Sequence, residues 1–190
     1  MTEVTDFPAL PPENRFRGYN VHPVEILSQE HRIIETKLEA LEAEIRAAKG
    51  GGPFRREFFE EALDFFRHFA DGCHHAKEED LLFPLLRERG MPQNGGPIAV
   101  MLAEHDEGRG YLKAVRSHLD AAAQGSREAQ EEVMHNASGY VHLLRSHIYK
   151  EDNVLFRMAH MMLQPDDVAE LTKQFSAVEV PARFQTAVGR

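Results

Sequence analysis

Histidine and glutamate recur four residues apart in two similar stretches of the sequence. One stretch reads HHAKEEDLLFP from His74, and the other reads HIYKEDNVLF from His147. Residues i and i+4 lie on one face of a helix, so Glu78 would stand beside His74 and Glu151 beside His147. A mixture of imidazole and carboxylate suits iron, manganese or zinc. The pattern therefore indicates a metal site between two facing helices.

Apolar residues recur at spacings of three and four along four segments, which predicts four amphipathic helices. The segments are approximately 24–49, 54–88, 97–123 and 127–162. The inward-facing stripe of the last segment continues to Val154 and Met161. Short stretches containing Gly or Pro separate the segments, and short connections make consecutive helices antiparallel. We predict an all-α fold, an up-down-up-down antiparallel four-helix bundle.

Three parts of the chain are expected. Residues 1–22 form an irregular N-terminal arm, because prolines recur there and remove backbone donors. Residues 23–163 form the bundle, and residues 164–190 form a short fifth helix and a C-terminal tail. In the second bundle helix, Gly72 predicts a local distortion and Pro84 a kink.

The composition excludes several classes of protein. The 190 residues suffice for a buried core, and a formal charge of −9 without a basic block argues against nucleic-acid binding. No apolar run approaches the roughly 18 residues of a membrane helix, and the N-terminus lacks the features of a secretory signal. The single cysteine, Cys73, cannot form an internal disulfide. We expect a cytoplasmic protein without nucleic-acid or membrane partners, as a monomer or a homodimer.

Each predicted helix places one histidine on its inward-facing stripe: His31, His74, His105 and His147. Burying imidazoles in an apolar core is unfavourable without partners, and burying an ionised glutamate is more so. One such histidine is more often structural, but four on four helices, two with Glu at i+4, favour metal binding. One cation would satisfy part of the set. Two cations would use all of it, with carboxylates bridging between them.

Several further residues leave alternatives open. Glu35, one turn after His31, is either a seventh ligand or a surface acid. Tyr140 could hydrogen-bond to a bound oxygen species, but a core position is favoured, and Cys73 is expected to be a small buried hydrophobe. The remaining histidines are expected at the surface, although His75 could support a ligand. They are His22, His68, His75, His118, His135, His142 and His160.

The order of these residues resembles the hemerythrin-like family, the His-His-Glu cation-binding four-helix bundles, over roughly residues 24–162. The likeness is carried by EHRIIE at His31, HxxxEExxLFP at His74, AEHDEGR at His105 and HIYKEDNVLF at His147. The resemblance implies a non-haem di-iron centre, with two iron ions as cofactor. It also implies that Glu78 and Glu151 are bridging carboxylates and that the histidines are terminal ligands.

One position departs from the oxygen-carrying hemerythrins that the chain resembles. Those proteins have a second histidine one turn after the third-helix ligand, where this sequence has Arg109. A guanidinium does not deprotonate and is not a normal ligand. Either Glu35 completes the ligand set or a coordination position is left to solvent, and both argue against simple reversible oxygen carriage. Arg109 is expected to pair with a ligand carboxylate or the first-helix acid, or to lie at the surface.

Two kinds of function follow from the resemblance. In the first, the protein binds or senses oxygen or a related small diatomic ligand, or handles iron. In the second, the same centre is an oxidoreductase that degrades peroxide or nitric oxide. Both kinds of function would use the same metal ligands. The sequence therefore does not decide whether the protein is a carrier, a sensor or an enzyme. A helical bundle without metal is a third reading, and the inward histidines argue against it.

Overall fold

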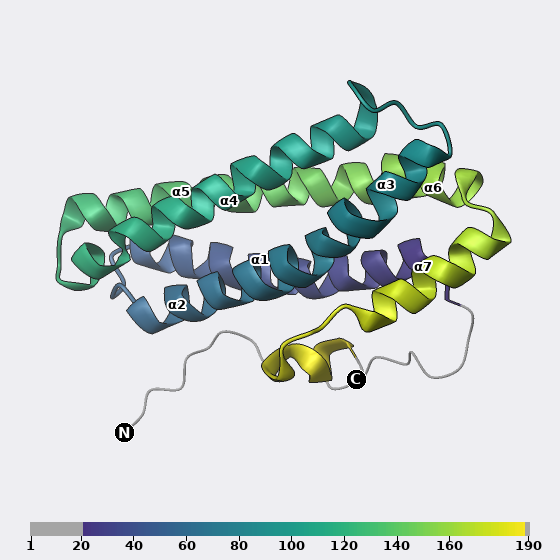
Figure 1. Ribbon diagram of the computed structural model, residues 1–190. Coiled ribbons are helices and arrows are strands. Elements are labelled where there is room, and N and C mark those ends of the chain that lie inside the picture. Colours follow the sequence, from purple (N-terminus) through teal and green to yellow (C-terminus); the bar gives the residue numbers. More distant parts are fainter. Residues whose placement is uncertain (1–20, 189–190) are drawn as a thin grey trace.

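Four long helical runs lie side by side in the computed structural model, which describes residues 21–188 (Figure 1). The first run is α1 (Pro23–Lys49), and the third is α4 (Gly96–Ala123). The second run joins α2 (Arg56–Phe65), η1 (Phe66–His75), η2 (Glu78–Leu82) and α3 (Phe83–Glu88). The fourth run joins α5 (Arg127–Lys150), η3 (Glu151–Leu155) and α6 (Phe156–Met162). The predicted all-α helical bundle is confirmed.

Two shorter helices follow the bundle, α7 (Pro165–Ala177) and the 3-10 helix η4 (Ala182–Val188). α7 is the predicted fifth helix, and it packs on the bundle through the buried side chains of Leu171 and Phe175. The predicted N-terminal arm lies outside the described residues as far as residue 20. Between residues 21 and 188, no helix combines the length and the apolar composition that crossing a bilayer requires.

Prolines and glycines mark the ends of the helices. Pro23 and Pro165 lie in the first turns of α1 and α7, where a missing N–H costs nothing. Gly125, between α4 and α5, has a φ of 94°, a left-handed conformation that favours glycine. The Ser126 hydroxyl then accepts a hydrogen bond from the Ala129 N–H at the start of α5. Such short turns keep consecutive runs antiparallel.

π-helical turns interrupt the second and fourth runs directly after the two repeated His-x-x-x-Glu pairs. In η2 the Phe83 N–H donates to the Glu78 carbonyl, and in η3 the Phe156 N–H donates to the Glu151 carbonyl. This i→i−5 bonding places one more residue in the turn than an α-helix does. Every later side chain is therefore rotated around the helix axis.

The inward stripe predicted for the end of the fourth run is wrong because of this rotation. Val154 and Met161 are 48% and 76% exposed. The buried residues of this segment include Leu155 and Ala159, and Leu155 lies one position after Val154. A periodicity of 3.6 residues does not apply across a π turn.

The irregularities predicted in the second run lie in or beside π-helix. Gly72 lies within the π-helix η1. Pro84 lies two residues after the end of η2, in the first turn of α3. The π turn thus rearranges the backbone hydrogen bonds beside the residue that has no N–H to donate.

Two apolar clusters fill the bundle, and a polar layer separates them. Along α1, Val24 and Leu27 belong to one cluster, whereas the residues from Ile33 onward belong to the other. His31 lies between these two sets. In each of the other three runs, the inward histidine likewise lies between residues of the two clusters. The inward histidines therefore share one polar layer.

Candidate metal centre

Seven buried histidine and glutamate side chains converge in this polar layer as two groups. Within each group, one ligand atom per residue lies within 4.8 Å of all the others. The first group is His31, His74, Glu78 and Glu151, and the second group is His75, Glu78, His105 and His147. Glu78 belongs to both groups, so its two carboxylate oxygens can face two different ions.

Every long run contributes to the groups. α1 supplies His31 and α4 supplies His105, while the second run supplies three residues and the fourth run two. The centre therefore exists only when all four runs are packed together. Metal binding at this place must be coupled to folding of the bundle.

A carboxylate holds the Nδ1 atom of each of the five histidines. The pairs are His31–Asp152 (2.9 Å), His74–Glu30 (3.1 Å), His75–Asp71 (3.4 Å), His105–Glu79 (2.7 Å) and His147–Glu104 (3.0 Å). An ionised carboxylate only accepts, so Nδ1 carries the proton, and in the neutral imidazole the lone pair is on Nε2. This is the tautomer and the fixed orientation of a metal-bound histidine.

A lysine or arginine pairs with every one of these carboxylates. The pairs are Lys77–Glu30, Lys150–Glu104, Arg32–Asp152, Arg109–Asp71 and Arg109–Glu79. Burial raises the pKa of Glu30, but Lys77 and His74 together outweigh burial, and the pKa falls to about 2. Such hydrogen bonds and charges favour the ionised form of the carboxylates whose pKa values are lowered, which are Glu30, Asp71, Glu104 and Asp152.

The ligand atoms lie close enough to share a cation. Oε2 of Glu151 is 3.1 Å from Nε2 of His31 and 3.2 Å from Nε2 of His147, so Glu151 contacts both groups. The Nε2 atoms of His105 and His147 are only 3.0 Å apart. Because both nitrogens would present lone pairs, a proton or a metal ion between them is needed to remove the repulsion.

Five buried polar atoms of the two groups have no hydrogen-bond partner within residues 21–188. They are Nε2 of His74, Nε2 of His75, both carboxylate oxygens of Glu78 and Oε1 of Glu151. A buried polar group without a partner costs roughly 1–3 kcal/mol. One or two cations in the polar layer would satisfy these atoms together, so the residues fit a metal centre.

The electrostatics of the two glutamates support the same conclusion. Burial and the charge of Glu151 raise the pKa of Glu78 well above its usual value. Burial raises the pKa of Glu151 as well, but His147 and His31 together outweigh burial and lower that pKa. Burial lowers the pKa of His147, but Glu151 and Glu104 together outweigh burial and raise it to about 9. Without a cation the layer therefore retains protons that a divalent ion would replace.

The family model of the hemerythrin HHE cation-binding domain matches residues 22–159, which include all seven side chains. The chain belongs to this family. The hemerythrin HHE family thus accounts for the order of the ligand residues and for the bundle that holds them.

Among curated relatives, the uncharacterized protein Rv1995 of Mycobacterium tuberculosis is 22% identical over 170 residues, covering 87% of this chain and 66% of that protein. The iron-sulfur cluster repair protein YtfE of Salmonella newport is 38% identical over 89 residues, covering 45% of this chain and 40% of that protein. This chain therefore spans less than two thirds of either relative. No solved structure gives a significant match.

The structure brings six of the seven predicted ligands together, and Glu35 is the exception. Its side chain is 34% exposed and pairs with Arg32 at 2.8 Å on the surface of α1. Glu35 directly follows Ile34, which is fully buried, and each residue advances about 100° around a helix. Of the two alternatives for Glu35, the structure has the surface acid, away from both groups.

His75 is not a surface residue. It is 5% exposed, its ring stacks on His105 with centroids 3.9 Å apart, and its Nε2 belongs to the second group. A regular helix with an i,i+4 spacing places His74, and not His75, beside Glu78. This spacing therefore gave no sign that His75 belongs to the second group. The distortion expected at Gly72 was the available signal, because a π turn brings two consecutive histidines toward one layer.

Arg109 pairs neither with a ligand carboxylate nor with an acid of α1. Its guanidinium donates to Asp71 (2.9 Å), to Glu79 (2.5 Å) and to Asp106 (2.9 Å). Asp71 and Glu79 are the carboxylates that hold His75 and His105. Arg109 thus supports two histidines of the second group at once.

Sequence reasoning missed the five carboxylates that hold the histidines. Four of them are sequence neighbours of a ligand: Glu30, Glu79, Glu104 and Asp152. Each of these four serves a histidine of a different run, so the neighbouring position alone does not reveal the pairing. Asp71 precedes His75 by one helical turn, the usual spacing of a pair on one helix.

Proposed function

We propose that this chain is a non-haem di-iron protein of hemerythrin type that binds or senses oxygen or a related small ligand. The observation that carries the proposal is the pair of four-ligand groups that share Glu78 and contain five unpartnered polar atoms. Membership of a cation-binding family supports it. A mixture of imidazole and carboxylate ligands suits iron.

In this proposal the first ion is bound by His31, His74, Glu78 and Glu151, and the second by His75, His105, His147 and Glu78. Glu78 bridges the two ions. The contacts of Glu151 with a histidine of each group support a bridging role for Glu151 too. Four residues per ion leave coordination positions for a further small ligand.

Bound iron would supply electron exchange with that small ligand. The protein residues supply the rest. The five carboxylates hold the proton on Nδ1 of each histidine and fix each ring. The apolar clusters on either side of the polar layer limit access of water to the centre.

A di-iron oxidoreductase that degrades peroxide or nitric oxide is the alternative, because the same free coordination positions admit those molecules. A role in handling iron is supported by the likeness to YtfE, an iron-sulfur cluster repair protein in Salmonella. The three readings share one centre and differ in what happens after a ligand binds.

Metal analysis of the purified protein tests the centre. We expect about two iron ions per chain and a near-ultraviolet band of bridged ferric iron. A protein that contains no iron, or a single zinc ion, would contradict the di-iron proposal.

Mixing the reduced protein with oxygen and, separately, with peroxide or nitric oxide tests the role. A stable spectrum that reverses when oxygen is removed indicates binding or sensing. Repeated turnover of peroxide or nitric oxide indicates an enzyme. Transfer of iron to an acceptor protein, without turnover, indicates iron handling.

A further inference from the structure

A small cavity lies against the second group. Its volume is about 10 Å³, and its walls include His75, His105 and His147. This volume is close to the least that holds one water-sized molecule. The remaining wall is largely apolar, with Gly108, Leu112 and Leu144 among its residues. The cavity thus adjoins the three histidines with space for a very small ligand only.

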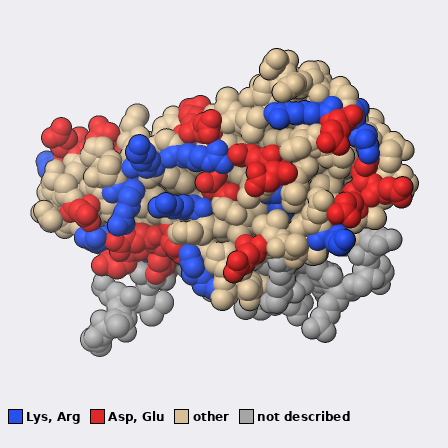
Figure 2. Space-filling model, in the orientation of Figure 1, with Lys and Arg blue, Asp and Glu red and all other residues tan. Residues whose placement is uncertain are grey.

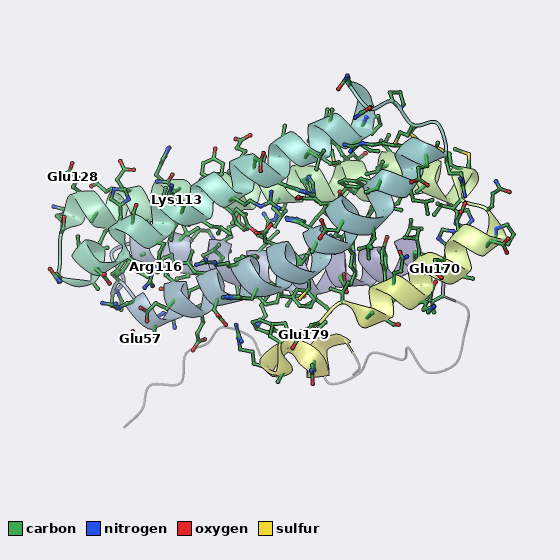
Figure 3. The ribbon with its side chains drawn as sticks, in the orientation of Figure 1. Glu57, Lys113, Arg116, Glu128, Glu170 and Glu179 are labelled. Atoms are coloured by element: carbon green, nitrogen blue, oxygen red, sulfur yellow. The ribbon has the colours of Figure 1, made fainter. Side chains whose placement is uncertain are left out.

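A much larger groove of about 660 Å³ lies on the surface between α4 and the α2–η1 segment. Lys113 and Arg116 line it from α4, and Figure 3 shows Arg116 on the side of α4 that faces α2. Figure 2 shows Lys and Arg side chains gathered on this face. The groove and the cavity share three wall residues: Asp71, Arg109 and Leu112.

A second surface groove, of about 390 Å³, lies between α1 and the fourth run, and its lining includes Arg32 and Asp152. It shares no lining residue with the cavity. Of these two grooves, only the one over α2 and α4 borders the cavity.

The wall between groove and cavity contains two charged residues that are held in place, Asp71 and Arg109, and one side chain that can move, Leu112. Arg109 is tied by charged hydrogen bonds to Asp71 and Glu79, and such bonds are among the strongest in proteins. Leu112 is held only by packing, in which each atomic contact is weak. Displacement of the Leu112 side chain is therefore the easier way to join groove and cavity.

We propose that very small ligands, no larger than a diatomic molecule, reach the second group from the groove over α2 and α4, past Leu112. Arg109 and Asp71 form the fixed edge of this passage. The inference rests on the proposed function, because it names the entry and the size limit of the same centre. It excludes larger substrates, which the cavity cannot hold.

Gly108 and Gly110 provide a matched pair of test positions on α4. A Cβ atom at Gly108 would lie 3.4 Å from Cε2 of Tyr140 and 3.7 Å from Cδ2 of Leu143, so Gly108→Ala fits and fills cavity space. A Cβ atom at Gly110 meets nothing within 4 Å. Both changes favour the helix by a similar amount, so they differ mainly in their effect on the cavity.

Relaxation of methyl groups by dissolved oxygen tests the passage without relying on activity. The full chain is studied with diamagnetic zinc in place of iron or, where the purified protein contains no iron, as purified. We expect oxygen to relax the Leu144 methyls more than those of Leu38, which is also buried but lines neither the cavity nor either groove. Gly108→Ala should reduce this excess, Gly110→Ala should retain it, and Leu112→Ala should increase it. Equal relaxation of Leu144 and Leu38, or no effect of Gly108→Ala, would overturn the passage.

A second measurement follows the rate of nitric oxide binding to the iron-loaded, reduced protein. Gly108→Ala should slow binding about tenfold, an increase of roughly 1.4 kcal/mol in the barrier. Leu112→Ala should accelerate binding, and iron content should be the same in all variants. Equal rates in the Gly108→Ala and Gly110→Ala proteins, with iron bound, would refute the passage and leave the proposed function intact. Absence of iron from the wild-type protein would refute the proposed function, and the relaxation comparison would still decide the passage.

Discussion

The two halves of the bundle present corresponding side chains to the metal centre, in the same order along the chain. The first half has Glu30, His31, His74, Lys77, Glu78 and Glu79, and the second has Glu104, His105, His147, Lys150, Glu151 and Asp152. Their contacts correspond as well. Glu30 of α1 holds His74 of the second run, as Glu104 of α4 holds His147 of the fourth run. Each half thus orients its histidines with carboxylates from a neighbouring run.

The halves differ at three positions that contact one another. The counterparts of Asp71 and His75 are Leu144 and Ile148, which are buried and apolar, and the counterpart of Arg109 is Glu35. Asp71 links His75 to Arg109 through hydrogen bonds. The second group therefore has three imidazoles where the first has two. The third imidazole of the second group is that of His75 in the second run. Glu35 of α1 does not reach this group, and α4 has Arg109 in place of a second histidine.

Removal of the shared carboxylate should have the largest effect on the centre. We expect Glu78→Ala to lose both ions. Although Glu151 contacts both groups, Glu151→Ala should lose mainly the ion of the first group, because the second group keeps all four of its residues. Metal analysis after gel filtration measures this difference. The two substitutions remove corresponding side chains, so equal retention of metal would contradict the shared position of Glu78.

Removal of the unmatched histidine should affect one ion only. We expect His75→Ala to retain the ion of the first group and to release the other, which would lower the iron content to about one per chain. The exposed His68 provides the control, because His68→Ala should leave the iron content unchanged. A His75→Ala protein with the full iron content would show that the third imidazole is not a ligand.

Loss of a supporting carboxylate should weaken binding without abolishing it. Glu30→Gln and Glu104→Gln should each lower the affinity of one ion by about 10- to 100-fold, the usual effect of removing a group that orients a metal ligand. Competition with a chelator measures these affinities. Glu107→Gln, an exposed change on α4, is the control. Similar losses of metal affinity in the two variants would support the correspondence of the halves. Wild-type affinity in both variants would refute it.

The metal-free protein should show opposite titrations of two corresponding histidines. Burial lowers the pKa of His74 to about 4, despite Glu30. Burial also lowers the pKa of His147, but Glu151 and Glu104 together overcome burial and raise that pKa to about 9. The contribution of His147 to stability is complete below its usual pKa of 6.5 and is lost as the pH rises through 9. The contribution of His74 is complete above 6.5 and is lost as the pH falls through 4.

Imidazole signals in a nuclear magnetic resonance titration of the metal-free protein measure these two pKa values. Melting temperatures across the same pH range should be highest near neutrality. Two histidines that both titrate near the usual value would show that the halves do not differ in this way.

The regular parts of the molecule were predictable from the sequence. Apolar spacing located the helices, and the inward positions of His31, His74, His105 and His147 follow from an undistorted helical period. The errors cluster where π turns break that period. In the fourth run, the π-helix η3 makes Leu155 the buried residue in place of Val154. In the second run, His75 is the last residue of the π-helix η1 and is buried beside His74.

Contacts between side chains of different runs were the second feature that the sequence did not predict. Arg109 was expected to pair with a ligand carboxylate or the first-helix acid, or to lie at the surface, and its partners depend on which helices are neighbours. Asp71 and Glu79 of the second run pair with Arg109 of α4, whereas Glu35 pairs with Arg32 on its own helix, at the surface. Periodicity places a side chain on a face of its own helix and does not specify the residue opposite.

Anomalous diffraction at the iron absorption edge, from crystals of the purified protein, tests the central claim most directly. The two groups predict two iron peaks, one within bonding distance of His31 and His74 and the other within bonding distance of His75, His105 and His147. Both peaks should contact the carboxylate of Glu78. A single peak, or a second peak that His75 does not reach, would contradict the asymmetric di-iron centre.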